Sequence, residues 1–290
     1  MTRPDRPGLM SVAQLFDSLQ NPQLRIVDAS TSLVLDGTSH RYIATSQREG
    51  YEQAHLPGAV FADVPAALSA PGARFDFTLP TSRHFAEQVA RLGIDNSSRV
   101  VVYDSGGAWA TRVWWLLRVF GHENVAILDG GKHAWESAGL PVESGPGRPE
   151  PGRFTAHLRP ELVVTTDEIA AADSESVCLV NALDPATFRG EQDINPYPRR
   201  GRIPGSQNLP FDSLLDPATG TFLPLAQLRE KLDTTGLLRS PRPIAYCGGG
   251  IAASLVAFAA HVAGRPDVAI YDGSLVEWTS DPDRPVELGA

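Results

Sequence analysis

The chain has 290 residues, of which 42% are hydrophobic and 20% charged, a composition typical of a globular protein of one or two domains. A net charge of −9 argues against a nucleic-acid partner, and no stretch approaches the roughly 18 apolar residues of a membrane helix, so no membrane partner is expected either. Two cysteines cannot form a disulfide framework, no histidine has metal-ligand spacing, and no signal-peptide-like segment follows the N-terminus, so we expect a cytoplasmic protein without a metal site.

The first half alternates short β-rich runs with longer apolar segments of helical length. In chain order it predicts a helix over Leu9–Leu19, strands over Leu24–Asp28 and Arg99–Tyr103, a helix over Trp109–Phe120 and a strand over Val125–Leu128. The segment 145–152 that follows is rich in proline and glycine, which discourage regular structure. We interpret it as a linker between two domains.

The second half repeats the first in the same order. It predicts a helix over Thr166–Ala172 with Thr166 as its cap, strands over Cys178–Asn181 and Pro243–Tyr246, a helix over Ile251–Val262 and a strand over Val268–Tyr271. The spacing repeats as well, because Asp104 precedes Asp129 by 25 positions and Cys247 precedes Asp272 by 25. The chain is therefore expected to contain two copies of one structural unit.

Strands that alternate with helices in each half predict an α/β fold. The expected architecture is two tandem domains, each a mainly parallel sheet flanked by helices. We place the first domain at residues 1–148 and the second at residues 153–290. An Asp-Gly turn ends the repeated part of each, and there Asp129 and Asp272 are expected to bond main-chain N–H groups of the turns.

Cys247 lies at the corner between a predicted strand and a predicted helix. The first N–H groups of a helix lack internal partners, and together with the helix dipole they favour an anion such as a thiolate. Three glycines directly after the cysteine allow the backbone to turn its N–H groups inward around one atom. The sequence therefore predicts a reactive sulfur whose charge is held by the main chain of Gly248, Gly249, Gly250, Ile251, Ala252 and Ala253.

Other conspicuous residues are interpreted as structural. Asp104 stands in the first half where the second half has Cys247, so the first domain is expected to be non-catalytic and to cover the loop of the second. Cys178 lies within a predicted strand, where a free cysteine packs as a small apolar residue. Trp114 and Trp115 are expected to pack in the core or at the domain interface.

Several short motifs occur in a fixed order along the chain. They are two segments that end in Pro-Gly and a small residue, two Asp-Gly turns each followed by a tryptophan, the segment Arg112-Val-Trp-Trp115, and the loop that begins at Cys247. Together they resemble the tandem-domain rhodanese family, the thiosulfate and 3-mercaptopyruvate sulfurtransferases, over about Leu9 to Glu287. The resemblance implies that Cys247 takes a sulfane sulfur from a small anionic donor, holds it as a persulfide and passes it to cyanide, a thiol or a thioredoxin-like protein. It implies no metal and no organic cofactor.

The donors of that family are anions, whereas this chain is acidic overall, so a local positive site is expected. The segment from Arg189 to Arg202 concentrates four arginines before a Pro-Gly turn of the second domain. A guanidinium suits bidentate recognition of sulfonate or carboxylate, so Arg189 together with Arg199 or Arg200 is predicted to orient the donor. Members of the family carry Arg-Phe-x-Gly here, whereas in this chain the arginine follows the phenylalanine.

Departures from the family pattern leave the donor open between thiosulfate and 3-mercaptopyruvate. Mercaptopyruvate enzymes place a serine where this loop has Gly249 and a histidine where the first domain has Phe77, although Asp63 matches their aspartate. Thiosulfate enzymes carry arginine and lysine where Gly248 and Gly249 stand here. Neither donor is singled out by the loop.

Three other functions fit parts of the pattern. A cysteine phosphatase or arsenate reductase loop needs an arginine six positions after the cysteine, where this chain has Ala253. The glycines after Cys247 fit a loose dinucleotide-binding pattern, but only about 40 residues follow Gly250, too few for the rest of such a domain. A rhodanese-like sulfur carrier or protein-interaction module without catalysis remains the alternative to an enzyme.

Overall fold

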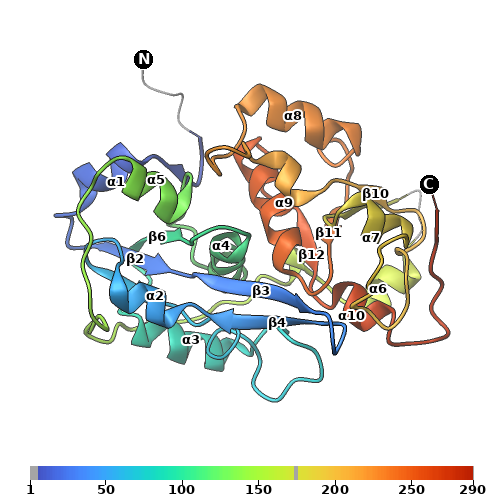
Figure 1. Ribbon diagram of the computed structural model, residues 1–290, viewed down its shortest axis with the longest axis horizontal. Helices are drawn as coiled ribbons and strands as arrows, with labels where there is room; N and C mark the ends of the chain where they lie inside the picture. Colours follow the sequence, from blue (N-terminus) through green and yellow to red (C-terminus); the bar gives the residue numbers. More distant parts are fainter. Residues whose placement is uncertain (1–5, 173–175, 290) are drawn as a thin grey trace.

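Two five-stranded sheets follow one another along the chain in the computed structural model, which describes residues 6–172 and 176–289 (Figure 1). The strands of the first sheet are β1 (Leu9–Met10), β2 (Leu24–Asp28), β5 (Ala59–Phe61), β6 (Arg99–Tyr103) and β7 (Val125–Leu128). Those of the second are β8 (Val163–Val164), β9 (Cys178–Asn181), β10 (Gln207–Asn208), β11 (Pro243–Tyr246) and β12 (Ala269–Tyr271).

The two sheets have the same topology. The strand order is β1-β7-β6-β2-β5 in the first and, in the corresponding direction, β8-β12-β11-β9-β10 in the second. Neighbouring strands within both sheets pair in parallel. The predicted α/β fold of two tandem domains is confirmed, and the repeat in the sequence is a repeat in structure.

Helices flank both sheets (Figure 1). They are α1 (Val12–Ser18), α2 (Arg48–Gln53), α3 (Ser82–Arg91), α4 (Trp109–Val119) and α5 (Gly131–Ser137) in the first domain, and α6 (Thr166–Ala171), α7 (Pro185–Arg189), α8 (Leu225–Thr234), α9 (Ile251–Val262) and α10 (Ser274–Trp278) in the second. Short 3-10 turns occur at Pro160–Leu162 and Phe211–Leu214. Within the described ranges, no helix is long and apolar enough to cross a membrane.

Helices α4 and α9 pack against each other across the domain interface, near the centre of Figure 1. The Trp114 ring meets the Phe258 ring edge-on at 4.9 Å between centroids, and the Thr111 and Ser254 hydroxyls lie 2.9 Å apart. Every side chain of α4 is buried, because this helix lies between its own sheet and the other domain. Both helices form where the sequence predicts them, α9 with the predicted first and last residues.

Two details of the predicted helix starts are wrong. Leu9–Met10 pair with β7 as strand β1 instead of opening the first helix, and α1 begins only after Ser11, whose side chain caps it. In the second domain the cap of α6 is Thr165 instead of Thr166, directly after the edge strand β8. An edge strand of two residues is too short to show a periodic pattern, so the sequence does not reveal where the helix takes over.

A β-hairpin between β2 and α2 is absent from the predicted elements. Its strands β3 (Thr31–Asp36) and β4 (Arg41–Ser46) pair in an antiparallel register. In Figure 1, β3 runs from the first domain toward α10 of the second. The pKa of Tyr42 in this hairpin is raised by burial and by the charge of Asp184 in the second domain. The hairpin therefore borders the domain that carries the cysteine.

Each domain also holds the other through the aspartate of its Asp-Gly turn. Asp129 accepts the N–H of Phe222 at 2.8 Å, and Asp272 accepts the N–H of Leu79 at 2.7 Å. Each donor lies three residues before a helix of the opposite domain, α8 or α3. These carboxylates do bond main-chain N–H groups, as expected, but groups of the other domain.

Candidate active site

Cys247 is held at the end of β11, and α9 begins four residues later at Ile251. Its side chain is buried at 2% exposure. Its own N–H donates to the Ser274 hydroxyl at 3.1 Å, and its carbonyl accepts the N–H of Leu275 at 3.1 Å. The carbonyl of Gly248 accepts a further N–H from α10 at 3.0 Å. The start of α10 thus fixes the first part of the loop.

The loop after Cys247 presents main-chain N–H groups for which the described residues provide no acceptor. In the described part of the chain, no hydrogen bond engages the N–H of Gly248, Gly249 or Gly250. Gly250 is the N-cap of helix α9, its φ of 81° favours glycine, and no side chain among the described residues caps the helix. The structure therefore brings the predicted loop together, with unpartnered donors next to the thiol.

The equivalent loop of the first domain shows what such donors bind. The carboxylate of Asp104 accepts the N–H of Gly106 at 2.9 Å and the N–H of Ala110 at 2.8 Å. Burial raises the pKa of Asp104, and these two bonds act in the opposite direction. Counted from the aspartate and from the cysteine, the same two positions in the second loop are Gly249 and Ala253.

A loop of the first domain covers the cysteine loop, as expected. A β-carbon placed on Gly249 would lie 3.4 Å from the Phe77 ring, so this side chain stands over the glycine turn. Phe77 has a φ of 61°, an unfavourable value for a residue with a side chain. Its carbonyl accepts a bond from Arg112 at 2.5 Å, and its ring packs edge-on against Trp109 at 5.3 Å.

Arg112 and Asp272 form a buried ion pair across the interface beside this loop. The Nη1 atom of Arg112 lies 2.7 Å from Oδ1 of Asp272 and 3.5 Å from the carbonyl oxygen of Gly250. The side chains are 1% and 10% exposed. The same guanidinium therefore contacts the Asp-Gly turn, the cysteine loop and the covering loop of the first domain.

Tyr197 is a residue of the site that the sequence does not single out. A β-carbon placed on Gly248 would collide with its hydroxyl and lie 2.9 and 3.0 Å from two of its ring carbons. Tyr197 is 9% exposed. It belongs to the arginine-rich segment before the Pro-Gly turn, and its position over the loop follows from the folding of that segment, which no local pattern reveals.

The three predicted donor-binding arginines are engaged away from the cysteine loop. Arg189 forms an ion pair with Glu191 at 2.7 Å. Arg199 donates to the carbonyls of Thr279 and Asp281 at 3.2 and 2.6 Å. Arg200 donates to three carbonyls of its own segment, those of Gly190, Gln192 and Asp193. Their hydrogen bonds within the described chain thus fasten this segment, and none reaches residues 247–253.

Cys178 is half-buried in β9, and its surroundings differ from those of Cys247. Its sulfur lies 3.1 Å from the carbonyl oxygen of Thr235, to which the thiol donates. Burial raises the pKa of this thiol. Both observations suit the structural role expected for it, because a protonated thiol is a poor nucleophile.

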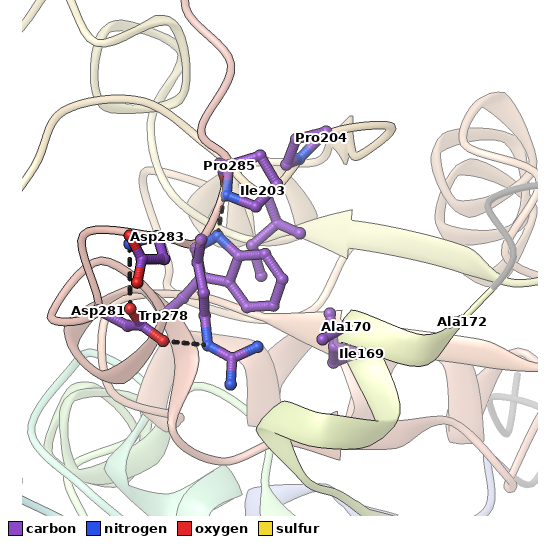
Figure 2. Close-up of a pocket in the computed structure, with 10 residues that line it drawn as sticks. Ile169, Ala170, Ala172, Ile203, Pro204, Trp278, Asp281, Asp283 and Pro285 are labelled. Atoms are coloured by element: carbon purple, nitrogen blue, oxygen red, sulfur yellow. Dashed lines mark hydrogen bonds and ion pairs between the residues drawn. The ribbon is translucent and has the colours of Figure 1, made fainter.

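A hollow of about 670 Å³ opens on the second domain away from this loop (Figure 2). Trp278 lies in its wall, with Arg284 stacked 5.1 Å from the ring centroid. The arginine is paired with Asp281 and Asp167, at 3.3 Å in each case. Cys247 does not line this hollow, and the arginine of its wall is already paired with two carboxylates.

A parallel-sheet domain that occurs twice, with a cysteine loop in one copy and a carboxylate in the other, defines a tandem rhodanese-like protein. Residues 11–138 and 170–281 match the family Rhodanese-like domain, and the chain belongs to this family. It is 36% identical to human 3-mercaptopyruvate sulfurtransferase over 283 residues, which cover 93% of this chain and 91% of that protein. It is also 36% identical to rat thiosulfate sulfurtransferase over 297 residues, 97% of this chain and 96% of that protein.

A solved structure is similar along nearly the whole chain. SseA from Escherichia coli, described as a 3-mercaptopyruvate sulfotransferase of the rhodanese fold, matches with a TM-score of 0.80 at 31% identity, over 92% of this chain and 98% of that one. The relatives include both sulfurtransferase types at equal identity. The chain is thus related to the thiosulfate and 3-mercaptopyruvate sulfurtransferases as a group, as its motifs indicated.

Proposed function

We propose that the protein is a sulfurtransferase in which Cys247 carries the transferred sulfur as a persulfide. The Cys247 thiolate attacks the sulfane sulfur of a small donor, and a new S–S bond forms. With thiosulfate the donor's S–S bond breaks and its electron pair leaves on sulfite. With 3-mercaptopyruvate the C–S bond breaks and, with one proton, pyruvate leaves. A cyanide ion or thiolate then attacks the outer sulfur, and the electron pair of the S–S bond returns to Cys247.

The observation that carries this proposal is the difference between the two loops. In the first domain an anion, the Asp104 carboxylate, occupies the N–H groups at the second and sixth positions after it. In the second domain the corresponding groups are those of Gly249 and Ala253, and the residue at the aspartate position is Cys247. An outer sulfur on Cys247 would make its side chain one atom longer, as the carboxylate oxygens do for Asp104. The negative charge on that sulfur suits the N–H groups at the same two positions.

The main chain of Gly248, Gly249, Gly250, Ile251, Ala252 and Ala253 is accordingly proposed to bind the sulfur anion. Arg189 is proposed to contact the donor, because its ion-pair partner Glu191 is a half-exposed side chain that a stronger anion can displace. We assign Arg199 and Arg200 an indirect role, because their bonds go to main-chain carbonyls. The proposed donor is thiosulfate or 3-mercaptopyruvate, and the proposed acceptor is a thiol or a thioredoxin-like protein in the reducing cytoplasm, where thiols persist.

Intact-protein mass spectrometry after incubation with each donor tests this function. The wild-type chain and Cys178→Ser are expected to gain the mass of one sulfur atom, whereas Cys247→Ser gains none. Cyanide or a thiol should remove the added sulfur from both persulfides. A gain of mass on Cys178, or none on the wild-type protein with either donor, contradicts the proposal. A persulfide that no acceptor discharges supports the alternative, a sulfur-carrier or protein-interaction module.

A further inference from the structure

We infer that the Tyr197 hydroxyl is a catalytic hydrogen-bond donor to the sulfur anion carried by Cys247. The inference rests on the proposed persulfide and adds a side-chain donor to the main-chain donors of the loop. A neutral phenol would thus bind part of the negative charge at the site, a task that the sequence analysis predicted for arginines. Tyr197 keeps its proton throughout, so no bond to hydrogen is made or broken at this residue during the cycle.

The contact between Tyr197 and Gly248 places the hydroxyl at the loop. The ring packs so closely that no β-carbon fits at position 248, as the contacts of 2.9 and 3.0 Å to two ring carbons show. Gly248 directly follows Cys247 and provides the first of the unpartnered N–H groups. The ring of Tyr197 therefore fills the space that a side chain at position 248 would need, and it lies on one side of the proposed sulfur site.

A negative charge on Cys247 changes the pKa of the Tyr197 hydroxyl. The pKa of Tyr197 is raised well above its ordinary value, first by burial and then by the negative charge of the Cys247 thiolate, with smaller effects of Tyr42 and Asp184. The hydroxyl consequently stays protonated and remains a donor. A hydrogen bond from a buried hydroxyl to an ionised acceptor is stronger than one between neutral groups.

The segment that carries Tyr197 is fixed by its own polar groups. The Asn195 side chain donates to the Tyr197 carbonyl at 2.6 Å and accepts from Gln192 at 2.9 Å. Arg200 in turn donates to the carbonyls of Gln192 and Asp193, the latter at 3.1 Å. In this inference Arg200 is a positioning residue that acts through Tyr197 and makes no contact with the loop.

Tyr197→Phe tests the hydroxyl while it keeps the ring against Gly248. The rate of sulfur transfer from the Cys247 persulfide to cyanide is expected to fall about 10- to 100-fold, the loss of one hydrogen bond to a charged group. The KM for the donor should stay nearly unchanged, because the bond is made to the sulfur after it has left the donor. The matched control is Tyr51→Phe, which removes the buried hydroxyl that donates to Ala59 at 2.7 Å in the first domain. It should lower the melting temperature without changing the transfer rate.

A double-mutant cycle tests the role of Arg200. Arg200→Ala is expected to slow transfer in the wild-type background and to have little further effect in Tyr197→Phe, because the hydroxyl through which it acts is gone. Equal effects in both backgrounds contradict the positioning role. Transfer by Tyr197→Phe at the wild-type rate overturns the inference and leaves the persulfide function standing. The absence of a persulfide on the wild-type protein instead overturns the proposed function itself.

Discussion

Asp104 and Cys247 occupy the same position of the repeat, and each stands before a glycine-rich loop that leads into a helix. The carboxylate of the first satisfies its loop with bonds of 2.9 and 2.8 Å. In the proposed persulfide, the outer sulfur on Cys247 gives the second a group of similar reach. The repeat thus allows a loop whose N–H groups are bound by a carboxylate to be compared with the loop proposed to hold a transferred sulfur. The comparison can be tested at a single residue.

Substitution of Cys247 by an aspartate should reproduce the first loop in the second. We expect Cys247→Asp to fold and to melt a few degrees above Cys247→Asn, because the carboxylate accepts the N–H groups of Gly249 and Ala253 by charge-assisted bonds worth about 1 kcal/mol more than neutral ones. Thermal melts of the two variants near neutral pH make the measurement. An asparagine variant that is as stable as the aspartate variant contradicts an anion preference of this loop.

At the scale of elements, the features that the sequence predicts are long helices and a loop whose residues are contiguous in the chain. Helices α4 and α9 are long, largely apolar segments, and the cysteine loop is a contiguous glycine run, so all three stand out in the sequence. The hairpin of β3 and β4 is absent from the predicted elements, although Asp36-Gly37 between two apolar runs is a sequence signal for a hairpin turn. The place of Tyr197 could not be predicted, because it depends on how a segment without regular structure folds back onto the loop.

The contact of α4 with α9 also makes stability depend on pH through His261. This residue lies on α9 beside the rings of Trp114 and Phe258. Burial, and then the charge of Arg118, lower the pKa of His261 from 6.5 to about 4. As pH falls from 6.5 toward 4, the unfolded chain therefore binds a proton that the folded chain does not, and stability is lost over this window.

His261→Leu should flatten this acid sensitivity. The variant removes the titrating group from the interface, so its urea-unfolding midpoint should fall less steeply than that of the wild type between pH 6.5 and 4, by up to one bound proton. His133→Leu, which changes an exposed histidine on α5, is the matched control and should follow the wild-type profile. Identical slopes for His261→Leu and the wild type would contradict the lowered pKa of the half-buried His261.

At the scale of the whole molecule, the two domains are joined by reciprocal bonds from the Asp-Gly turns. The bond from Leu79 to Asp272 lies beside the cysteine loop, because Arg112 contacts both Asp272 and the carbonyl of Gly250. The bond from the N–H of Phe222 to Asp129 lies at the Asp-Gly turn of the first domain. The repeat thus uses one device twice, and the copy at Asp272 lies beside the cysteine loop. The first domain thereby supports that loop although it has no cysteine of its own.

Paired substitutions at the two aspartates separate stability from catalysis. Asp272→Asn leaves the Arg112 guanidinium buried without its counter-charge, so it should cost about 3 kcal/mol of stability and release the Phe77 loop from Gly249. Sulfur transfer should then slow about tenfold or more, because the closed geometry of the site is lost. Asp129→Asn should lower the melting temperature but leave the transfer rate of the folded protein unchanged. Single-turnover transfer from the Cys247 persulfide, measured below both melting temperatures, makes the comparison. Equal slowing by the two substitutions would mean that domain contact in general, and not the Arg112–Asp272 pair, supports the reaction.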